Sequence, residues 1–249
     1  MQVADLVRLA VERPLSLEEA HAVFGEVMHG RATPVQMAAL LAAIRARGAA
    51  PEEVAGGVHA LREAMVPVPV PADARVVDTC GTGGGTLTTF NISTAAAILA
   101  AGAGVQIAKH GNRSFSSRCG SADVLEAMGV RIDLKPDAEA RVFEEVGIVF
   151  MFAPAHHPAM RHVAPVRREL AMPTLMNVLG PLTNPAGARR QVVGVSDPAL
   201  LELIASALNV LGHERALVVH GEPGIDELSP LGASHVVELA DGTLRRWRF

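Results

Sequence analysis

The sequence predicts an α/β protein in which a small all-helical N-terminal domain precedes a larger domain with a doubly wound, mainly parallel sheet. In the first 65 residues apolar positions recur at helical spacing, whereas after residue 70 short apolar runs alternate with helical segments. Between the two parts lies the segment VPVPVP at 66–71, which cannot be helical because alternate residues are proline. We therefore expect a helical domain over 1–70 and an α/β domain over 71–249.

Capping signals divide the N-terminal region into several short helices. Two capping boxes predict helix starts, a proline at a first helical position supports one of them, and two glycines predict stops. These residues are Ser16 with Glu19, Thr33 with Gln36, Pro34, Gly30 and Gly48. The apolar stripes between them are typical of a core or of subunit contacts.

Five short apolar runs predict the strands of the parallel sheet, at 76–77, 105–108, 148–153, 192–195 and 216–219. A helical pattern at 198–211 lies between the last two runs. Residues 234–239 and 243–249 flank Asp241-Gly242, a dipeptide typical of a tight hairpin turn. The sheet should therefore end in an antiparallel edge.

The composition of the chain limits the classes of protein to which it can belong. The chain has 249 residues, a net charge of −4 and a pI near 6.2, so no global charge attracts nucleic acid or an anionic membrane. The two cysteines, Cys80 and Cys119, have no metal-ligand spacing and indicate a reducing compartment. The N-terminus lacks the apolar region of a signal peptide, and the alanine-rich stretch at 94–108 is shorter than the roughly 20 residues of a membrane span. We expect a cytoplasmic enzyme.

A glycine loop follows the first predicted strand. Gly81, Gly83, Gly84 and Gly85 allow backbone N–H groups to approach an anion closely. A helix start with polar side chains then faces the same loop, at Asn91, Ser93 and Thr94. Such a loop alone is more often an ordinary turn.

The second predicted strand strengthens the phosphate interpretation because it ends in Lys109-His110-Gly111-Asn112-Arg113. The chain has only two lysines against twenty arginines, so Lys109 directly after a buried strand indicates a specific contact. His110, by contrast, is more simply interpreted as a structural histidine. Together the two segments predict a pocket for a phosphorylated sugar.

An adjacent acid pair, Asp226-Glu227, follows the fifth predicted strand. With the glycine loop, the Lys109 cluster and His156-His157, it makes four segments at the carboxyl ends of strands, where ligands bind in open α/β sheets. Carboxylate oxygens of this kind suit Mg²⁺ held together with substrate phosphates. Zinc is disfavoured because the ten histidines are scattered and neither cysteine has a close partner.

Eight motifs resemble the anthranilate phosphoribosyltransferase family, in the same order. They are GTGG at 81–84, FNIST at 90–94, KHGNR at 109–113, GSAD at 120–123, HPAM at 157–160, VRREL at 166–170, NVLGPLTNP at 177–185 and DELSP at 226–230. Two departures stand out. The family loop usually continues with aspartate where this chain has Gly85, and family members usually run on for several more helices beyond Phe249.

The resemblance implies a nucleoside phosphorylase/phosphoribosyltransferase type of fold, with helices from about 157–185 joining the helical domain. It implies transfer of the phosphoribosyl group of phosphoribosyl pyrophosphate to the amino group of anthranilate in tryptophan biosynthesis, with Mg²⁺ as cofactor and a homodimer as assembly. Lys109 would act by electrostatics, without a covalent nucleophile. The implied contacts with phosphoribosyl pyrophosphate are Gly81, Thr82, Gly83, Gly84, Asn91, Thr94, Lys109 and Ser121. The implied metal ligands are Ser93, Asp226 and Glu227, and the implied anthranilate contacts are Asn112 and Arg167.

Two other functions remain open at this stage. A pyrimidine nucleoside phosphorylase shares the architecture but normally has a Lys-His-Ser-Thr-Gly-Gly arrangement, whereas this chain separates GTGG from KHGNR. A non-catalytic nucleic-acid-binding relative should have a basic surface and degraded metal ligands, whereas this chain is acidic and keeps Asp226 and Glu227.

Overall fold

Four helices form the N-terminal region: α1 (Val3–Glu12), α2 (Leu17–Met28), α3 (Pro34–Arg47) and α4 (Pro51–Ala64). The computed structural model describes residues 2–83, 87, 89–114 and 119–249. Both predicted capping boxes are present, at the starts of α2 and α3, and Pro34 begins α3. Gly30 and Gly48 follow the ends of these helices with φ of 71° and 89°, values that favour glycine. The predicted starts and stops are confirmed.

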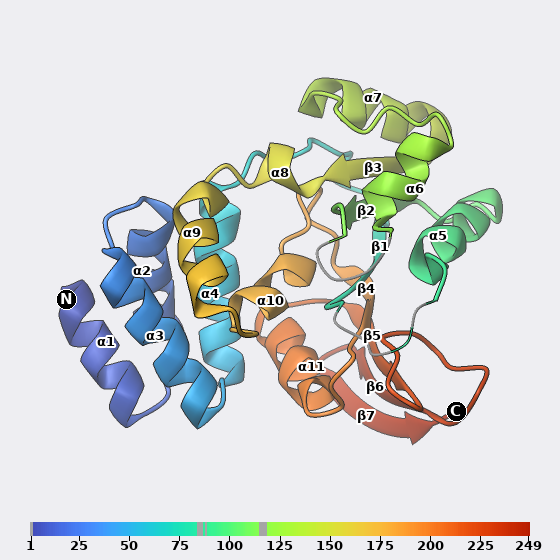
Figure 1. The fold of residues 1–249 in the computed structure, drawn as a ribbon. Helices are drawn as coiled ribbons and strands as arrows, with labels where there is room; N and C mark the ends of the chain where they lie inside the picture. Colours follow the sequence, from blue (N-terminus) through green and yellow to red (C-terminus); the bar gives the residue numbers. More distant parts are fainter. Residues whose placement is uncertain (1, 84–86, 88, 115–118) are drawn as a thin grey trace.

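The helical region includes a fifth long helix from later in the chain, α9 (Met160–Leu170), which packs against α2 and α3. Figure 1 shows α1 to α4 and α9 side by side, with the strands on the other side of the molecule. The hydrophobic core of this bundle continues without interruption into α11 (Leu200–Val210) and the neighbouring strands. One continuous hydrophobic cluster therefore joins the helical bundle to α11 and its neighbouring strands.

The sheet has seven strands in the order β3-β2-β1-β4-β5-β6-β7. The first five pair in parallel, and β6 and β7 pair in an antiparallel way around the predicted Asp241-Gly242 turn. The predicted hairpin is thus confirmed. The strands are β1 (Val77–Gly81), β2 (Ile107–Gly111), β3 (Ile148–Phe152), β4 (Arg190–Gly194), β5 (Arg215–Gly221), β6 (Ser234–Ala240) and β7 (Thr243–Arg248).

Helices cover both faces of this sheet, as the prediction of a doubly wound fold requires. Along β3, Phe150 packs with the core of α6 (Ser121–Ala127), while Val149 and Met151 point to the opposite face and pack with α7 (Pro136–Val146). The helix α5 (Ile92–Gly102) packs on β1 and β2, and α11 packs on β5 and β6. Short connecting helices complete the fold: α8 (Ala153–His156), α10 (Met176–Leu179) and the 3-10 turn η1 (Gly180–Leu182).

The segment 66–71 is extended, as its prolines predict, and it is also packed against the body of the protein. The Val66 N–H donates to the His156 carbonyl at 2.8 Å, and the Val68 N–H donates to the Pro185 carbonyl at 3.0 Å. The Val68 side chain is buried in the same core as α7 and β3. This segment therefore joins the two parts of the molecule through defined contacts.

A fully buried carboxylate, Glu53, lies inside the helical bundle. The Arg47 guanidinium donates to it at 2.6 Å, the Leu15 N–H at 3.0 Å and the Ala50 N–H at 2.9 Å. These donors come from the end of α3, the start of α2 and the start of α4. One side chain thereby ties three helix termini together.

Candidate active site at the carboxyl edge of the sheet

Lys109 lies inside a strand, whereas the sequence predicted that it would follow one. The strands β1 and β2 begin later and run further than the apolar runs indicated, so Asp78 lies within β1 and Lys109 within β2. The parallel ladder with β4 extends β1 as far as Gly81, and a local apolar pattern cannot reveal such pairing. The prediction that Lys109 follows its strand is wrong.

Lys109 is almost completely buried beneath the N-terminus of α5. Its Nζ donates to the Thr79 carbonyl and lies 3.3 Å from the Ser93 hydroxyl. Burial lowers the pKa of the Lys109 ammonium, and the nearby acids Asp78 and Glu227 act in the opposite direction. The side chain therefore brings a cation to the edge where the glycine loop and α5 begin.

Asp78 lies on the opposite face of the sheet from Lys109 and does not reach this edge. Its carboxylate accepts the His110 N–H at 3.1 Å and the Gln191 side-chain amide at 3.4 Å. Burial raises the pKa of the Asp78 carboxyl, and the charge of Lys109 acts against this rise. The residue stabilises the strands that hold the site.

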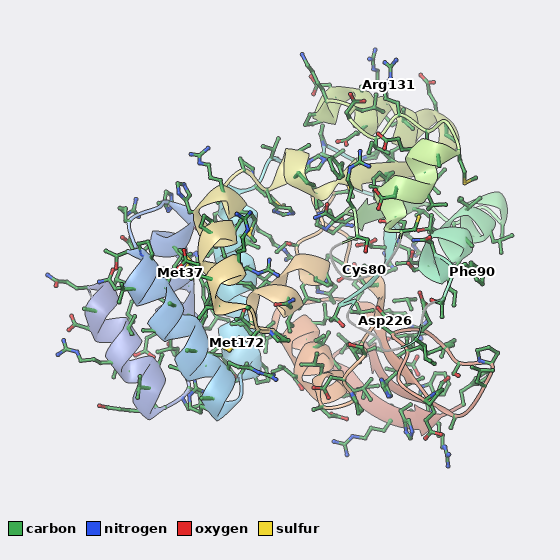
Figure 2. The ribbon with its side chains drawn as sticks, viewed as in Figure 1. Met37, Cys80, Phe90, Arg131, Met172 and Asp226 are labelled. Atoms are coloured by element: carbon green, nitrogen blue, oxygen red, sulfur yellow. The ribbon has the colours of Figure 1, made fainter. Side chains whose placement is uncertain are left out.

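The acid pair after β5 faces the glycine loop and the start of α5. Asp226 Oδ2 accepts the Gly83 N–H at 3.1 Å, and Glu227 Oε1 accepts the Ser93 N–H at 3.1 Å. Burial raises the pKa of the Glu227 carboxyl to about 7, and the negative charge of Asp226 adds to the rise. Figure 2 shows Asp226 close to Cys80, near the ends of the central strands. Three predicted segments are thus brought together.

Main-chain contacts hold the acid pair tightly against β4. A Cβ added at Gly194 would lie 1.7 Å from the Asp226 carbonyl oxygen, and one at Gly81 would lie 2.7 Å from Asp226 Oδ2. The Ser196 hydroxyl donates to the Gly83 carbonyl at 2.9 Å and fixes the glycine loop from the other side. Sequence reasoning missed Gly194 and Ser196 because both depend on which strand neighbours β1.

The starts of α5 and α6 are joined to the segment after β2. The Ser121 hydroxyl donates to the Asn112 carbonyl at 3.3 Å, and the Asn91 amide donates to the Cys119 carbonyl at 3.1 Å. Predicted site residues on three separate segments, Asn91, Asn112 and Ser121, are therefore linked through short contacts. Arg113 is paired with Asp123 and Glu126 instead.

Thr94 joins this cluster only through its main chain, where its N–H donates to the Asn91 carbonyl at 3.1 Å, and Arg167 and Gly84 have no described contact with it. Thr94 is buried, and its hydroxyl has no hydrogen-bond partner among the residues that the structure describes. Arg167 lies on α9, on the helical side of the molecule, and burial lowers its pKa. Gly84, like Gly85, lies outside the described residues.

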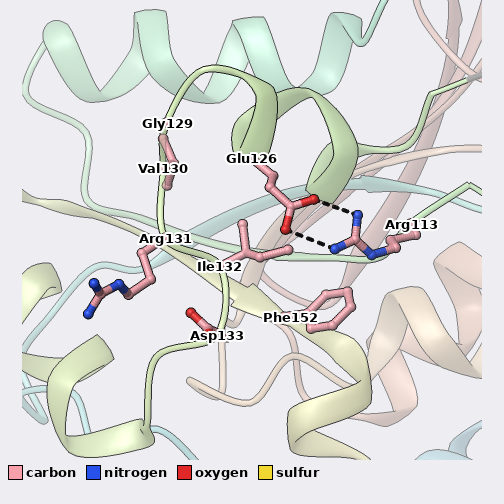
Figure 3. A pocket seen from close by; sticks show the side chains of 8 residues that line it. All are labelled: Arg113, Glu126, Gly129, Val130, Arg131, Ile132, Asp133 and Phe152. Carbon is pink, nitrogen blue, oxygen red and sulfur yellow. Dashed lines mark hydrogen bonds and ion pairs between the residues drawn. The ribbon is translucent and has the colours of Figure 1, made fainter.

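A hollow of about 480 Å³ opens beside this edge, between the end of β3 and the segment after α6. Figure 3 shows it, with Glu126 and Arg113 joined by two hydrogen bonds and Phe152 nearby. It is lined by Arg113, Glu126, Gly129, Val130, Arg131, Ile132, Asp133 and Phe152. Of these, Arg113 alone belongs to a segment of the predicted site, and it is paired with Asp123 and Glu126, so the hollow is not the candidate active site.

The donor set fits a magnesium ion better than a transition metal. In the described part of the chain no group of three or more histidine, cysteine or acidic side chains could hold a metal by itself. The edge has two neighbouring carboxylates, and the pKa of one of them is raised because burial and the other carboxylate disfavour its negative charge. A bound divalent cation would stabilise that charge. Mg²⁺ commonly binds through one or two carboxylates and completes its shell with water and substrate phosphates.

Comparison with known proteins places the chain in a family. A model described as the helical bundle domain of a glycosyl transferase family matches residues 6–65, and one described as its a/b domain matches residues 73–249. An anthranilate phosphoribosyltransferase from Herpetosiphon aurantiacus is 51% identical over 97% of this chain and 71% of the relative. The chain belongs to the anthranilate phosphoribosyltransferase family. A relative of the same name from Moorella thermoacetica is 49% identical over the whole chain and 73% of its own length.

Solved structures of family members agree with this assignment. The anthranilate phosphoribosyltransferase of Thermus thermophilus superposes with a TM-score of 0.92 at 48% identity, covering 98% of this chain and 73% of that one. The enzyme of Saccharomyces cerevisiae, solved in complex with PRPP and Mg, gives 0.83 at 27% identity, covering 94% and 68%. The predicted fold class is therefore confirmed.

Proposed function

We propose that this chain transfers the phosphoribosyl group of phosphoribosyl pyrophosphate to the amino group of anthranilate, with release of pyrophosphate, as a step of tryptophan biosynthesis. One observation supports this above others. The glycine loop, the buried Lys109 and the Asp226-Glu227 pair meet at one edge of the sheet, in a chain about half identical to curated anthranilate phosphoribosyltransferases.

Ser93, Asp226 and Glu227 would hold magnesium together with the substrate phosphates. A yeast relative has been solved with PRPP and Mg, and another yeast structure has Mg bound. A bound magnesium ion would supply positive charge to the departing pyrophosphate. The raised pKa of Glu227 supports this assignment, because two partly buried adjacent carboxylates without a cation are electrostatically unfavourable.

The other phosphate contacts would come from the chain itself. Lys109 places a positive charge beside Ser93, where it would stabilise negative charge as the bond to the anomeric carbon breaks. The Gly83 N–H after β1 and the Ser93 N–H at the start of α5 both face the acid pair. We assign the phosphoribosyl pyrophosphate contacts to Gly81, Thr82, Gly83, Gly84, Asn91, Thr94, Lys109 and Ser121.

Asn112 and Arg167 would bind anthranilate. Burial is the sole cause of the lowered Arg167 pKa, so within the described residues no carboxylate neutralises this partly buried guanidinium. Such a cation suits the carboxylate of an aromatic amino acid, which it can hold through two parallel hydrogen bonds. No covalent intermediate is needed, since the amino group of anthranilate is itself the nucleophile.

We also propose that the protein acts as a homodimer in the cytoplasm. No helix in the described part of the chain is long and apolar enough to cross a membrane. The exposed side of the helical bundle includes Val11 and Val35, apolar side chains that a partner subunit would cover. Light scattering at micromolar concentration should give twice the mass of one chain, and a monomer would contradict the dimer.

An assay of the purified protein tests the function. Anthranilate fluorescence should fall only when phosphoribosyl pyrophosphate and magnesium are both present. Turnover of thymidine or uridine with phosphate, and none with anthranilate, would instead identify a pyrimidine nucleoside phosphorylase. Adding a chelator to the reaction should stop anthranilate consumption, and unchanged consumption would contradict the metal assignment.

A further inference from the structure

His156 lies where the helical part of the molecule meets the sheet, and both of its ring nitrogens face acceptors. Nδ1 is 2.9 Å from the Val66 carbonyl oxygen, and Nε2 is 3.1 Å from Glu139 Oε1. His156 and Glu139 are both fully buried. The two residues come from α8 and α7, and Val66 begins the extended segment 66–71.

These two contacts fix the number of protons. A carbonyl oxygen and an ionised carboxylate accept hydrogen bonds and cannot donate them. Both contacts are hydrogen bonds only if Nδ1 bears a proton and one further proton lies between Nε2 and Glu139 Oε1, either on the ring or on the carboxyl. A neutral ring facing an ionised Glu139 would leave one of the two acceptors facing a lone pair inside the protein.

The groups around His156 favour the charged ring. Burial lowers the pKa of His156, the Glu139 carboxylate and the Val66 carbonyl raise it, and the result is a pKa above the ordinary value. The other titratable groups on this side are His157, which follows in the chain, and His110 on β2. Burial, with the charge of His156 added, lowers the pKa of His157 to about 4, and burial holds the pKa of His110 well below its usual range.

The neutral histidines are themselves in contact. His157 Nε2 lies 3.2 Å from His110 Nε2, a distance at which one neutral ring donates and the other accepts. His110 directly follows Lys109 in β2. Glu139 thus contacts His156, His157 follows His156 in the chain, and His157 contacts His110 on the strand that presents the buried cation of the candidate site.

We propose that Glu139 and His156 share one buried proton, which holds segment 66–71 to the sheet at Val66 and positions His157 against His110. The pair does not touch substrate and acts through its neighbours. The Val66 N–H donates to the His156 carbonyl at 2.8 Å, so the junction is held by main-chain and side-chain bonds together. The consequence for catalysis rests on the proposed function, whereas the protonation state does not.

Glu139→Gln removes the charge of the pair but can keep both hydrogen bonds of His156. The amide of glutamine can donate to Nε2 while a neutral His156 donates from Nδ1 to Val66, so both bonds persist without a charge. The matched control is Glu63→Gln, because Glu63 forms an exposed pair with His21 in the helical bundle, at 2.9 Å. Both variants remove one carboxylate beside a histidine, and only one of these is buried.

The direct measurement is ¹⁵N NMR of the full chain with labelled histidine. In the wild type and in Glu63→Gln, His156 should bear protons on both ring nitrogens at pH 7 and titrate above about 6.5. In Glu139→Gln its midpoint should fall by about one pH unit or more. A wild-type midpoint at or below about 6.5, or the same midpoint in Glu139→Gln, would overturn the shared proton.

Activity provides the test of positioning. Glu139→Ala should lower kcat/KM about tenfold at pH 7, and Glu139→Gln should restore it to within a few-fold of the wild type. Because the raised pKa of His156 means that its contribution is lost as pH rises, wild-type kcat/KM should fall at alkaline pH more steeply than that of Glu139→Gln. Wild-type activity in Glu139→Ala would overturn the positioning role. A wild type inactive on anthranilate would refute the proposed function and leave the NMR result to decide the proton.

Discussion

Two glutamates in this molecule, Glu53 fully buried and Glu227 partly buried, are satisfied in very different ways. Glu53, in the helical bundle, accepts hydrogen bonds from Arg47 and from the N–H groups of Leu15 and Ala50. Glu227, at the carboxyl edge of the sheet, accepts one described hydrogen bond, from the Ser93 N–H, and stands beside a second acid. The first carboxylate is neutralised within the chain, and the second is not.

The difference in how the two carboxylates are neutralised indicates which of them contributes to stability and which to function. A buried charge with a cation and several donors holds helix ends in place and has little remaining capacity for a ligand. A partly buried carboxylate with a raised pKa costs stability in the free protein and is stabilised most when a cation binds. Glu53 and Glu227 should therefore respond in opposite ways to substitution.

The largest effect is expected from Glu53→Ala. Removing this carboxylate leaves Arg47 and two N–H groups without their acceptor, so the free energy of unfolding should fall by about 3–5 kcal/mol. Urea unfolding followed by circular dichroism measures the loss. The neighbouring Glu52 is exposed, so Glu52→Ala provides the control and should change stability little. Equal losses in the two variants would show that the Glu53 network has no special role.

Glu227→Gln, in contrast to Glu53→Ala, should lower activity without lowering stability. It keeps an acceptor for the Ser93 N–H but removes the charge that would hold magnesium, so kcat/KM should fall about 10²–10³-fold. Glu222→Gln changes an exposed acid of the same loop and should stay near wild-type activity. Steady-state rates across a magnesium series give the comparison, and an unchanged magnesium dependence in Glu227→Gln would mean that the acid pair is only a solvated turn.

The same variant should gain stability with a defined pH dependence. The pKa of Glu227 is raised to about 7 in the folded state, above its value of about 4.3 in an unfolded chain. Folding is therefore penalised increasingly as pH rises from about 4.3 to 7, and fully above 7. Allowing for solvent screening, Glu227→Gln should be more stable than wild type by about 1 kcal/mol at pH 8 and equal to it at pH 4. Melting temperatures at the two pH values would test this, and a loss at pH 8 would contradict it.

The smallest effect belongs to a helix cap in the bundle. Ser16→Ala removes the side-chain acceptor for the Glu19 N–H at the start of α2 and should cost about 1 kcal/mol. Ser16→Gly should cost only a few tenths of that amount, because glycine leaves the N–H groups open to water. Thermal unfolding would rank the two variants. A fall in kcat/KM of the folded Ser16→Ala protein would contradict the expectation that the helical bundle affects stability and the sheet edge affects activity.

Local signals predicted much of the fold. The capping boxes, the glycine stops and the Asp241-Gly242 hairpin depend on residues a few positions apart, and the structure has all of them. The extents of β1 and β2 were wrong because they depend on pairing with strands far along the chain. For the same reason the contact of Lys109 with Thr79 could not be predicted.

The site was predicted in part. Motif order identified the segments that meet, such as the glycine loop with Asp226 and the start of α5 with Glu227. The Glu53 network was missed because adjacent acids in a first helical turn normally face water, and only tertiary packing turns one of them inward. The role of Arg167 stays a prediction, since no described contact joins α9 to the acid pair.

The contact at Gly194 limits how this site could be redesigned. The obstacle to a side chain there is the main-chain oxygen of Asp226, at 1.7 Å from an added Cβ, and no change of rotamer can move it. A saturation library at this position would yield active protein only from glycine, even though Gly194 has no side chain to offer a substrate. Transplanting the acid loop onto another parallel sheet would require a glycine at the end of the strand beneath it.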